Sequence, residues 1–222
     1  MSKSLIWTLQ DSCTIKWMNK FSKSEYDIQH QPLIKLRKNI YFKGLHKEIK
    51  KYDTLIISSQ FAATNITSIL DRKFNILSVG KKATKLLKKM GHLIIYSANN
   101  SKELASYIDN KIDAKILHPC SEKSNFSIWP KNVTSLPFYS PIPNINFNIS
   151  NIKISSKTII VFGSPSGVDV WFKNDYNLKD AKVATIGDTT AKKILSYSKR
   201  ALITPKKATI DELCLTIYKH LE

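Results

Sequence analysis

The stretch Val183-Ala-Thr-Ile-Gly-Asp-Thr-Thr-Ala-Lys-Lys-Ile-Leu195 decides the fold, because it changes from a strand pattern to a helix pattern at one glycine. Its first four residues predict a buried strand, and Gly187 predicts a turn where that strand ends. Asp188, Thr189 and Thr190 are typical of a helix N-terminus. Such a turn directs backbone amides and threonine hydroxyls beyond the end of the strand, which suits an anion. The same residues would also serve a well-capped helix that binds nothing.

The pattern occurs a second time, in Ile76-Leu-Ser-Val-Gly-Lys-Lys-Ala-Thr-Lys-Leu-Leu87, where the turn falls at Gly80. In each copy an earlier apolar strand ends in small polar residues. The first of these strands leads into Ser59, 21 positions before Gly80, and the second leads into Ser164, 23 positions before Gly187.

A helix-capping sequence follows each copy at a similar distance. Asn100-Ser-Lys-Glu103 ends 23 positions after Gly80, and Thr209-Ile-Asp-Glu212 ends 25 positions after Gly187. Both sequences precede apolar residues at helical spacing, which is typical of a capping box. The repeated order and spacing predict two copies of one βαβα unit.

Strands that alternate with helices predict an α/β fold with parallel sheets covered on both faces. We expect two doubly wound parallel-sheet domains, one of them discontinuous, joined by a two-stranded β linker. Ligands of such sheets bind beyond the carboxyl ends of the strands. The four turns that follow these strands, at Ser59, Gly80, Ser164 and Gly187, are therefore expected to line an active site in a cleft between the domains.

The domain boundaries follow from the first strand and from a proline-rich segment. Ser4 to Leu9 has no partner strand nearby and is expected to pair with the C-terminal unit. Pro137, Pro141 and Pro143 exclude a helix and mark the return crossover. The predicted domains are residues 1–31 with 145–222 and residues 38–132, with linker strands at 32–37 and 133–144. Residues 144–156, rich in Asn, Ile and Ser, predict a surface loop.

The composition is that of an ordinary globular protein of 222 residues, with 42% hydrophobic and 10% aromatic residues. No apolar run approaches the roughly 18 residues of a membrane helix, and the N-terminus lacks the pattern of a signal peptide. Cys13, Cys120 and Cys214 are widely spaced, which predicts reduced thiols. These features predict a cytoplasmic protein without a membrane partner.

The formal net charge of +18 favours a polyanionic partner such as nucleic acid or a substrate with many carboxylates. Codon usage that favours Lys, Ile and Asn would also produce this charge without any partner. The sequence has no arginine-rich arm, zinc-finger spacing or aromatic RNA-binding motif. We therefore expect no nucleic-acid partner.

Motifs of common catalytic chemistry are missing from the sequence. The five histidines show no metal-ligand spacing, and His118 is expected to be structural. There is no nucleotide-binding glycine motif and no serine-nucleophile motif, and the 17 acidic residues form no evident catalytic pair. We expect neither a metal nor a cofactor, so an enzyme with this sequence would act through hydroxyl groups and backbone amides.

Segments along nearly the whole chain resemble the uroporphyrinogen-III synthase family in their order and spacing. They are Tyr52-Asp-Thr-Leu-Ile-Ile-Ser-Ser59, Ser78-Val-Gly-Lys-Lys-Ala-Thr84, Asn99-Asn-Ser-Lys-Glu-Leu-Ala-Ser-Tyr-Ile108, Ile116-Leu-His-Pro-Cys120, Phe138-Tyr139, Phe162-Gly-Ser-Pro-Ser-Gly167 and Ile186-Gly-Asp-Thr-Thr-Ala191. The family consists of cofactor-free enzymes with two α/β domains, which agrees with the repeat.

The resemblance implies an enzyme, a lyase of haem biosynthesis that cyclises hydroxymethylbilane to uroporphyrinogen III. The reaction loses water and inverts ring D through a spiro intermediate. Tyr139 matches the family's tyrosine that is proposed to assist departure of the substrate's hydroxyl, a role that a phenol can fill by donating a hydrogen bond. Without the resemblance, Tyr139 would be taken for an ordinary packing aromatic.

By the same resemblance, turns in both copies hold the acetate and propionate groups of the substrate. The implied substrate-binding residues are Ser59, Gly80, Lys81, Thr84, Ser164, Ser166, Gly167, Lys182, Gly187, Thr189 and Thr190. Threonine hydroxyls and strand-end amides would supply the hydrogen bonds.

Two departures from the family concern the substrate pocket. Family members often carry an arginine and a proline after the first strand, where this chain has Thr8-Leu-Gln10, and the segment after Cys120 is short.

We expect a monomer. The sequence leaves open whether the chain makes a transient contact with porphobilinogen deaminase, the enzyme that supplies the substrate. The alternatives are a non-catalytic two-domain anion-binding protein and a basic nucleic-acid-binding protein.

Overall fold

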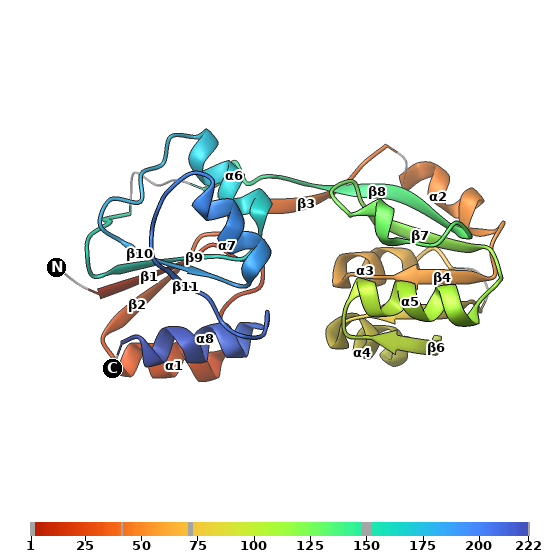
Figure 1. Ribbon diagram of the computed structural model, residues 1–222, viewed down its shortest axis with the longest axis horizontal. Helices are drawn as coiled ribbons and strands as arrows, with labels where there is room; N and C mark the ends of the chain where they lie inside the picture. Colours follow the sequence, from red (N-terminus) through yellow and green to blue (C-terminus); the bar gives the residue numbers. More distant parts are fainter. Residues whose placement is uncertain (1–2, 41, 71–72, 148–151, 222) are drawn as a thin grey trace. The chain divides into compact units, whose positions relative to one another are not determined.

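The computed structural model describes residues 3–40, 42–70, 73–147 and 152–221. The chain divides into two compact units, coloured by sequence in Figure 1. The terminal unit comprises Met1–Lys35 and Ile142–Glu222, and the central unit comprises Leu36–Pro141. Each unit has its own sheet.

The sheet of the terminal unit has five strands in the order β11-β10-β9-β1-β2, and all four neighbouring pairs are parallel. The strands are β1 (Lys3–Trp7), β2 (Tyr26–His30), β9 (Thr158–Phe162), β10 (Lys182–Thr185) and β11 (Leu202–Ile203). Strand β1 pairs with β9, and Ile6 lies opposite Ile160. The prediction that the first strand joins the C-terminal unit is therefore confirmed.

Helices cover both faces of this sheet (Figure 1). Helices α1 (Ile15–Lys23) and α8 (Ile210–Lys219) pack through Trp17, Phe21 and Leu213 on one face. Helices α6 (Pro165–Lys173) and α7 (Asp188–Leu195) pack on the other face through a second core. Because β-strand side chains alternate between faces, neighbouring strand residues such as Ile159 and Ile160 enter different cores.

The sheet of the central unit has six strands in the order β3-β8-β7-β4-β5-β6. They are β3 (Ile34–Lys38), β4 (Thr54–Ile57), β5 (Asn75–Val79), β6 (Leu93–Ala98), β7 (Ile116–Ser121) and β8 (Val133–Pro143). The pairs from β8 to β6 are parallel. Strands β3 and β8 run in opposite directions, because Asn39 N–H donates to the Phe138 carbonyl while Asn144 N–H donates to that of Leu33.

Helices again cover both faces of the central sheet. Helices α2 (Phe42–Ile49), α3 (Gln60–Thr67) and α4 (Lys81–Lys89) contribute to one core, and α5 (Ser101–Lys111) contributes to the other. A short 3₁₀ helix, η1, spans Phe126–Ile128 after β7. The expected α/β class with doubly wound sheets is confirmed, and the β3–β8 pair makes the central sheet mixed.

The predicted surface loop at 144–156 forms no helix or strand where it is described, and Ile145 in it is exposed, but two of its residues are buried. Residues 148–151 lie outside the described residues, but Phe147 and Ile152 on either side are buried in the core under α6. Phe147 packs against Trp171 with ring centroids 5.9 Å apart. The segment therefore contributes to the core, which its Asn-rich composition did not indicate.

No helix in the described part of the chain is long and apolar enough to cross a membrane.

Candidate active site

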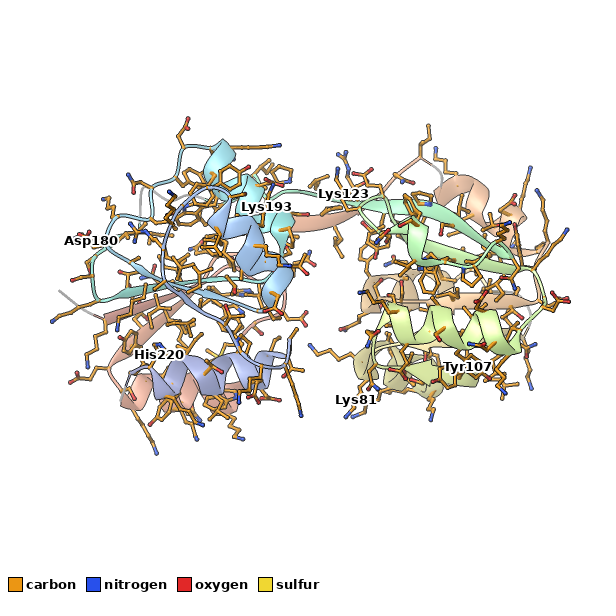
Figure 2. All side chains as sticks on the ribbon, viewed as in Figure 1. Lys81, Tyr107, Lys123, Asp180, Lys193 and His220 are labelled. Carbon is orange, nitrogen blue, oxygen red and sulfur yellow. The ribbon has the colours of Figure 1, made fainter. Side chains whose placement is uncertain are left out.

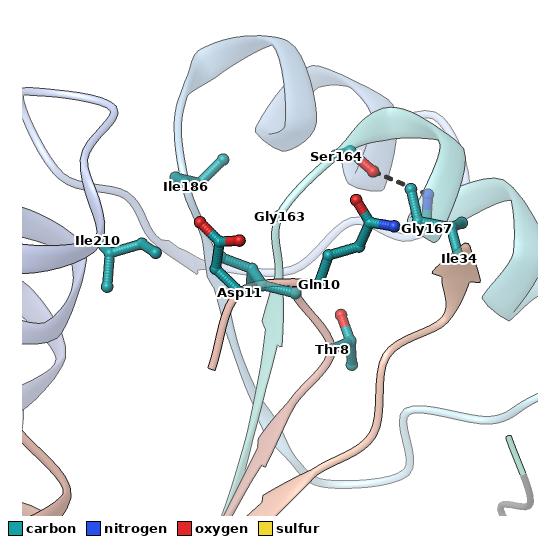
Figure 3. A pocket seen from close by; sticks show the side chains of 10 residues that line it. Thr8, Gln10, Asp11, Ile34, Gly163, Ser164, Gly167, Ile186 and Ile210 are labelled. Atoms are coloured by element: carbon teal, nitrogen blue, oxygen red, sulfur yellow. Dashed lines mark hydrogen bonds between the residues drawn. The ribbon is translucent and has the colours of Figure 1, made fainter. Parts of the chain in front are cut away.

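In the terminal unit, the turn after β9 is built around Ser164 (Figure 3). Ser164 is the N-cap of α6, and its Oγ accepts a hydrogen bond from the backbone N–H of Gly167 at 3.1 Å. Pro165 occupies the first helical position, where an N–H would have no helical acceptor. The Gly167 amide is therefore used within the cap, and this corrects the expectation that it is available to a substrate. Ser166 is half-buried in the same turn.

A pocket of about 230 Å³ lies beside this turn (Figure 3). Its lining comes from the residues after β1, the first residue of β3, the turns after β9 and β10, and the start of α8: Thr8, Leu9, Gln10, Asp11, Ile34, Gly163, Ser164, Gly167, Ile186 and Ile210. The pocket lies at the carboxyl ends of parallel strands, the edge where such sheets bind ligands. Of the predicted site residues, only Ser164 and Gly167 line it.

Gln10 and Asp11 are pocket residues that the sequence analysis missed. They follow β1 directly, where the family resemblance led us to look for an arginine and a proline. The predicted pairing of β1 with the C-terminal unit could have pointed to them, because that pairing brings the carboxyl end of β1 beside Gly163.

The turn after β10 begins α7 as the sequence predicts. Gly187 is its N-cap, and the Gly187 carbonyl accepts hydrogen bonds from the N–H groups of Thr190 and Ala191. Thr189 is exposed, whereas Thr190 is buried, with 3% of its surface exposed. The amides of Asp188 and Thr189 precede these bonds and lack helical acceptors, so these two amides and the exposed Thr189 hydroxyl can meet an anion.

Lys182 is not brought together with these turns. It is the first residue of β10, whereas Gly187 follows the carboxyl end of the strand. At about 3.3 Å per residue, roughly 16 Å of extended chain separates the two positions. The structure therefore does not bring Lys182 together with this turn, and its role in substrate binding stays a prediction from the family resemblance.

In the central unit, Tyr139 and Ser59 come together although they are 80 positions apart. The Tyr139 hydroxyl donates a hydrogen bond to Ser59 Oγ at 2.9 Å. Ser59 is the N-cap of α3 and follows β4, and Tyr139 lies opposite Ser121, the last residue of β7. Both groups thus lie at the carboxyl edge of the central sheet, the expected edge for a ligand.

Aromatic side chains enclose Tyr139. Its ring centroid lies 4.6 Å from that of Phe61 and 4.9 Å from that of Phe138, and only 6% of the residue is exposed. Burial raises the pKa of Tyr139, partly offset by the hydrogen bond to Ser59. The phenol therefore stays protonated at neutral pH and acts as a donor.

The turn after β5 contains Gly80 and Thr84. Gly80 is the N-cap of α4 with a φ of 82°, a region that side-chain-bearing residues rarely adopt. The Thr84 hydroxyl donates to the Gly80 carbonyl at 3.0 Å and lies 2.8 Å from both Ser78 Oγ and Ser97 Oγ. Because one donor and two lone pairs complete a hydroxyl, Thr84 has no hydrogen bond left for a carboxylate in this arrangement.

Lys81 opens α4 and is exposed on the surface of the central unit (Figure 2). An ammonium group on a flexible stem at a helix N-terminus can reach an anion held by the same turn.

His118 occupies a buried position in β7. Its Nε2 lies 2.8 Å from Ser58 Oγ, its Nδ1 lies 3.4 Å from Ser135 Oγ, and its ring packs edge-on against Trp129. Burial lowers the pKa of His118 to about 4. The expectation of a structural histidine is confirmed. Among the described residues, no group of histidines, cysteines and carboxylates is arranged to hold a metal ion.

The fold and these turns define a class: a doubly wound α/β protein of two units whose candidate site residues are hydroxyls and helix-start amides at the carboxyl edges of the sheets. The sequence model for uroporphyrinogen-III synthase HemD matches residues 16–214. The chain belongs to this family. The family assigns it the function of a uroporphyrinogen-III synthase, a hydro-lyase of tetrapyrrole biosynthesis, and implies hydroxymethylbilane as the substrate.

Solved structures share the fold of this chain. The chain is similar to uroporphyrinogen-III synthetase from Helicobacter pylori, with 14% identity, a TM-score of 0.71, and coverage of 99% of this chain and 100% of the other. It is also similar to a mutant uroporphyrinogen III synthase from Thermus thermophilus, with 12% identity, a TM-score of 0.62 and coverage of 99% and 98%. A search of curated protein sequences found no match.

Proposed function

We propose that this chain closes hydroxymethylbilane into uroporphyrinogen III through its Tyr139–Ser59 pair and the turns at the carboxyl edges of both sheets. The observation that carries the proposal is the hydrogen bond from the Tyr139 phenol to Ser59 Oγ. It supports the proposal because a protonated, enclosed donor on β8 then contacts the turn after β4, at the edge where a ligand of a parallel sheet is expected.

The reaction needs a donor at the hydroxyl that leaves ring A. When that C–O bond breaks, the leaving oxygen gains charge, and a hydrogen-bond donor stabilises it. The electrons of the ring A pyrrole nitrogen fill the vacancy at carbon and give an azafulvene-like cation. Attack by the substituted carbon of ring D gives the spiro intermediate, which fragments and recloses with ring D inverted.

The carboxylates of the substrate need several anion-binding groups at once. The first turns of α4 and α7 supply backbone amides as donors, because the first amides of a helix have no helical acceptor. In α6 the Gly167 amide is used by the cap and Pro165 has no N–H, so the Ser166 amide is the donor offered there. Ser166, Thr189 and Lys81 add a hydroxyl or an ammonium group at three of these turns. Holding the two ends of the linear substrate in one conformation would favour inversion of ring D over simple ring closure, since orientation lowers the barrier of an intramolecular step.

A coupled assay tests the function. Porphobilinogen deaminase generates hydroxymethylbilane in the cuvette, and the oxidised products are separated into isomers I and III. We expect predominantly isomer III from the wild-type chain. Isomer I alone, from protein shown to be folded, would mean that the chain binds anions without catalysing the inversion.

Exchanging Tyr139 for Phe tests the donor. We expect the rate of isomer III formation to fall about 10²- to 10⁴-fold, the range of general acid catalysis, with little change in stability because the ring packing remains. Thermal unfolding of the variant is the control. An unchanged rate would remove Tyr139 from the mechanism but leave the function intact.

The cellular setting is also part of the proposal. Cys13, Cys120 and Cys214 are all free thiols and all buried, which supports a reducing, cytoplasmic environment. We propose a monomer that takes its substrate from porphobilinogen deaminase without a stable complex. Sedimentation of the chain alone and mixed with the deaminase measures both points.

A further inference from the structure

The hydrogen-bonding capacity of Ser59 determines which group can reach the substrate. Ser59 Oγ accepts from the backbone N–H of Ala62 at 3.0 Å and from the Tyr139 hydroxyl at 2.9 Å. A hydroxyl has two lone pairs and one hydrogen. Both lone pairs of Ser59 are therefore occupied, and its hydrogen has no acceptor among the described residues.

The two hydroxyls also differ in exposure. Tyr139 is 6% exposed behind the rings of Phe61 and Phe138, whereas Ser59 is half-buried in the turn at the carboxyl edge of the sheet. The neighbouring Ser58 is tied to His118 at 2.8 Å. The use of the Ser58 hydrogen depends on the tautomer of His118, whereas Ser59, with both lone pairs occupied, has only its hydrogen left to offer outward.

We propose that Ser59 is the group that touches the departing hydroxyl of the substrate, and that it passes on the proton of Tyr139. This inference rests on the proposed function. Tyr139 alone would then be the proton source, and Ser59 the catalytic residue at the substrate, held in place by its bond to Ala62.

The step balances as follows. Ser59 gives its hydrogen to the leaving oxygen as the C–O bond breaks, and the electron pair of that bond leaves on oxygen as water. Ser59 Oγ takes the proton of Tyr139 in the same step, and the pyrrole nitrogen supplies the electrons that form the cation. The proton that ring D loses on final closure returns through Ser59 to the phenolate. One proton enters and one leaves, so no co-reactant is needed.

Four variants test the relay: Ser59→Gly, Ser59→Thr, Tyr139→Phe and the double variant Ser59→Gly/Tyr139→Phe. Glycine removes the hydroxyl and is well tolerated at an N-cap, and threonine keeps both the cap and the hydroxyl. Asn100→Ala is the matched control, because Asn100 caps α5 of the same unit through Glu103 N–H at 3.0 Å and has no part in the proposed site.

The relay predicts a specific pattern in kcat for isomer III. The kcat of Ser59→Gly falls about 10²- to 10⁴-fold, as that of Tyr139→Phe does. The kcat of the double variant falls no further, since both changes interrupt the same proton relay. Ser59→Thr stays within about 10-fold of wild type, and Asn100→Ala keeps the wild-type kcat.

Three results would overturn the relay, with wild-type formation of isomer III as the separate test of the proposed function. A Ser59→Gly variant with wild-type kcat would show that the hydroxyl is not used. Losses that multiply in the double variant would show two independent roles. A folded Ser59→Thr variant as slow as Ser59→Gly would show that something other than the hydroxyl matters.

Discussion

At the scale of single residues, His118 links burial to the pH dependence of stability. Its ring is 2% exposed between two serines, and its folded pKa is lowered to about 4 from the ordinary value near 6.5. Below pH 6.5 the unfolded chain binds a proton at this histidine while the folded chain does not, so stability falls as the pH drops toward 4.

We therefore expect His118 to lower the free energy of unfolding by about 2 kcal/mol when the pH falls from 7 to 5. The measurement is urea unfolding of wild type and His118→Gln at both pH values. Glutamine keeps a donor and an acceptor for the serines but does not titrate. Other groups titrate alike in the two proteins, so the difference isolates His118. An equal loss in both proteins would contradict the expectation.

What the sequence revealed at this scale depended on distance along the chain. Ser59 was expected in a turn and is found there, because strand endings and caps are local patterns. Its bond to Tyr139 depends on the register of β7 and β8, which local patterns do not contain. The role of Lys182 came from the family resemblance alone, and this residue lies at the start of β10, at the other end of the strand from Gly187.

At the scale of elements, the turn after β10 is limited by the space at Gly187. Its φ of 175° is extended backbone that any residue adopts, so conformation alone permits alanine. A Cβ at Gly187 would, however, lie 3.1 Å from the Cβ of Ala208, in the segment that leads into α8. The turn and that segment must then move apart.

We expect Gly187→Ala to destabilise the protein by about 1–2 kcal/mol through this overpacking. Adding Ala208→Gly should restore most of the loss, because it removes the contacting methyl group. Ala208 is exposed, so Ala208→Gly alone is a suitable control with a small effect. Unfolding free energies of the three variants measure this. No recovery in the double variant would mean that the contact does not limit the turn.

The elements themselves were largely predictable because their signals are periodic and local. Asn100 caps α5 as expected, and Glu103 reaches back to the N–H of Asn99, which lowers the pKa of Glu103. The exceptions lack such signals. Phe147 and Ile152 enter the core from a segment without strand or helix periodicity, so only packing reveals their role.

At the scale of the whole molecule, the net charge of +18 has two explanations that salt can separate. If the charge attracts a polycarboxylate substrate, it acts at long range before binding, and salt screens it. If the lysines contribute nothing to substrate capture, salt should affect kcat/KM little. In the proposed complex the substrate carboxylates accept short hydrogen bonds at the helix starts, and salt screens these bonds much less.

We expect kcat/KM for hydroxymethylbilane to fall roughly ten-fold between about 50 mM and 500 mM NaCl, while kcat changes little. The fall belongs to kcat/KM because this quantity includes the encounter of free enzyme and substrate, whereas kcat starts from the bound complex. The deaminase in the coupled assay must be in excess at every salt concentration, so that its own salt response does not limit the rate. A kcat/KM independent of salt would assign the lysine excess to composition. A parallel fall in kcat would instead place the screened charges at the chemical step, and Lys81 would then be the first side chain to exchange.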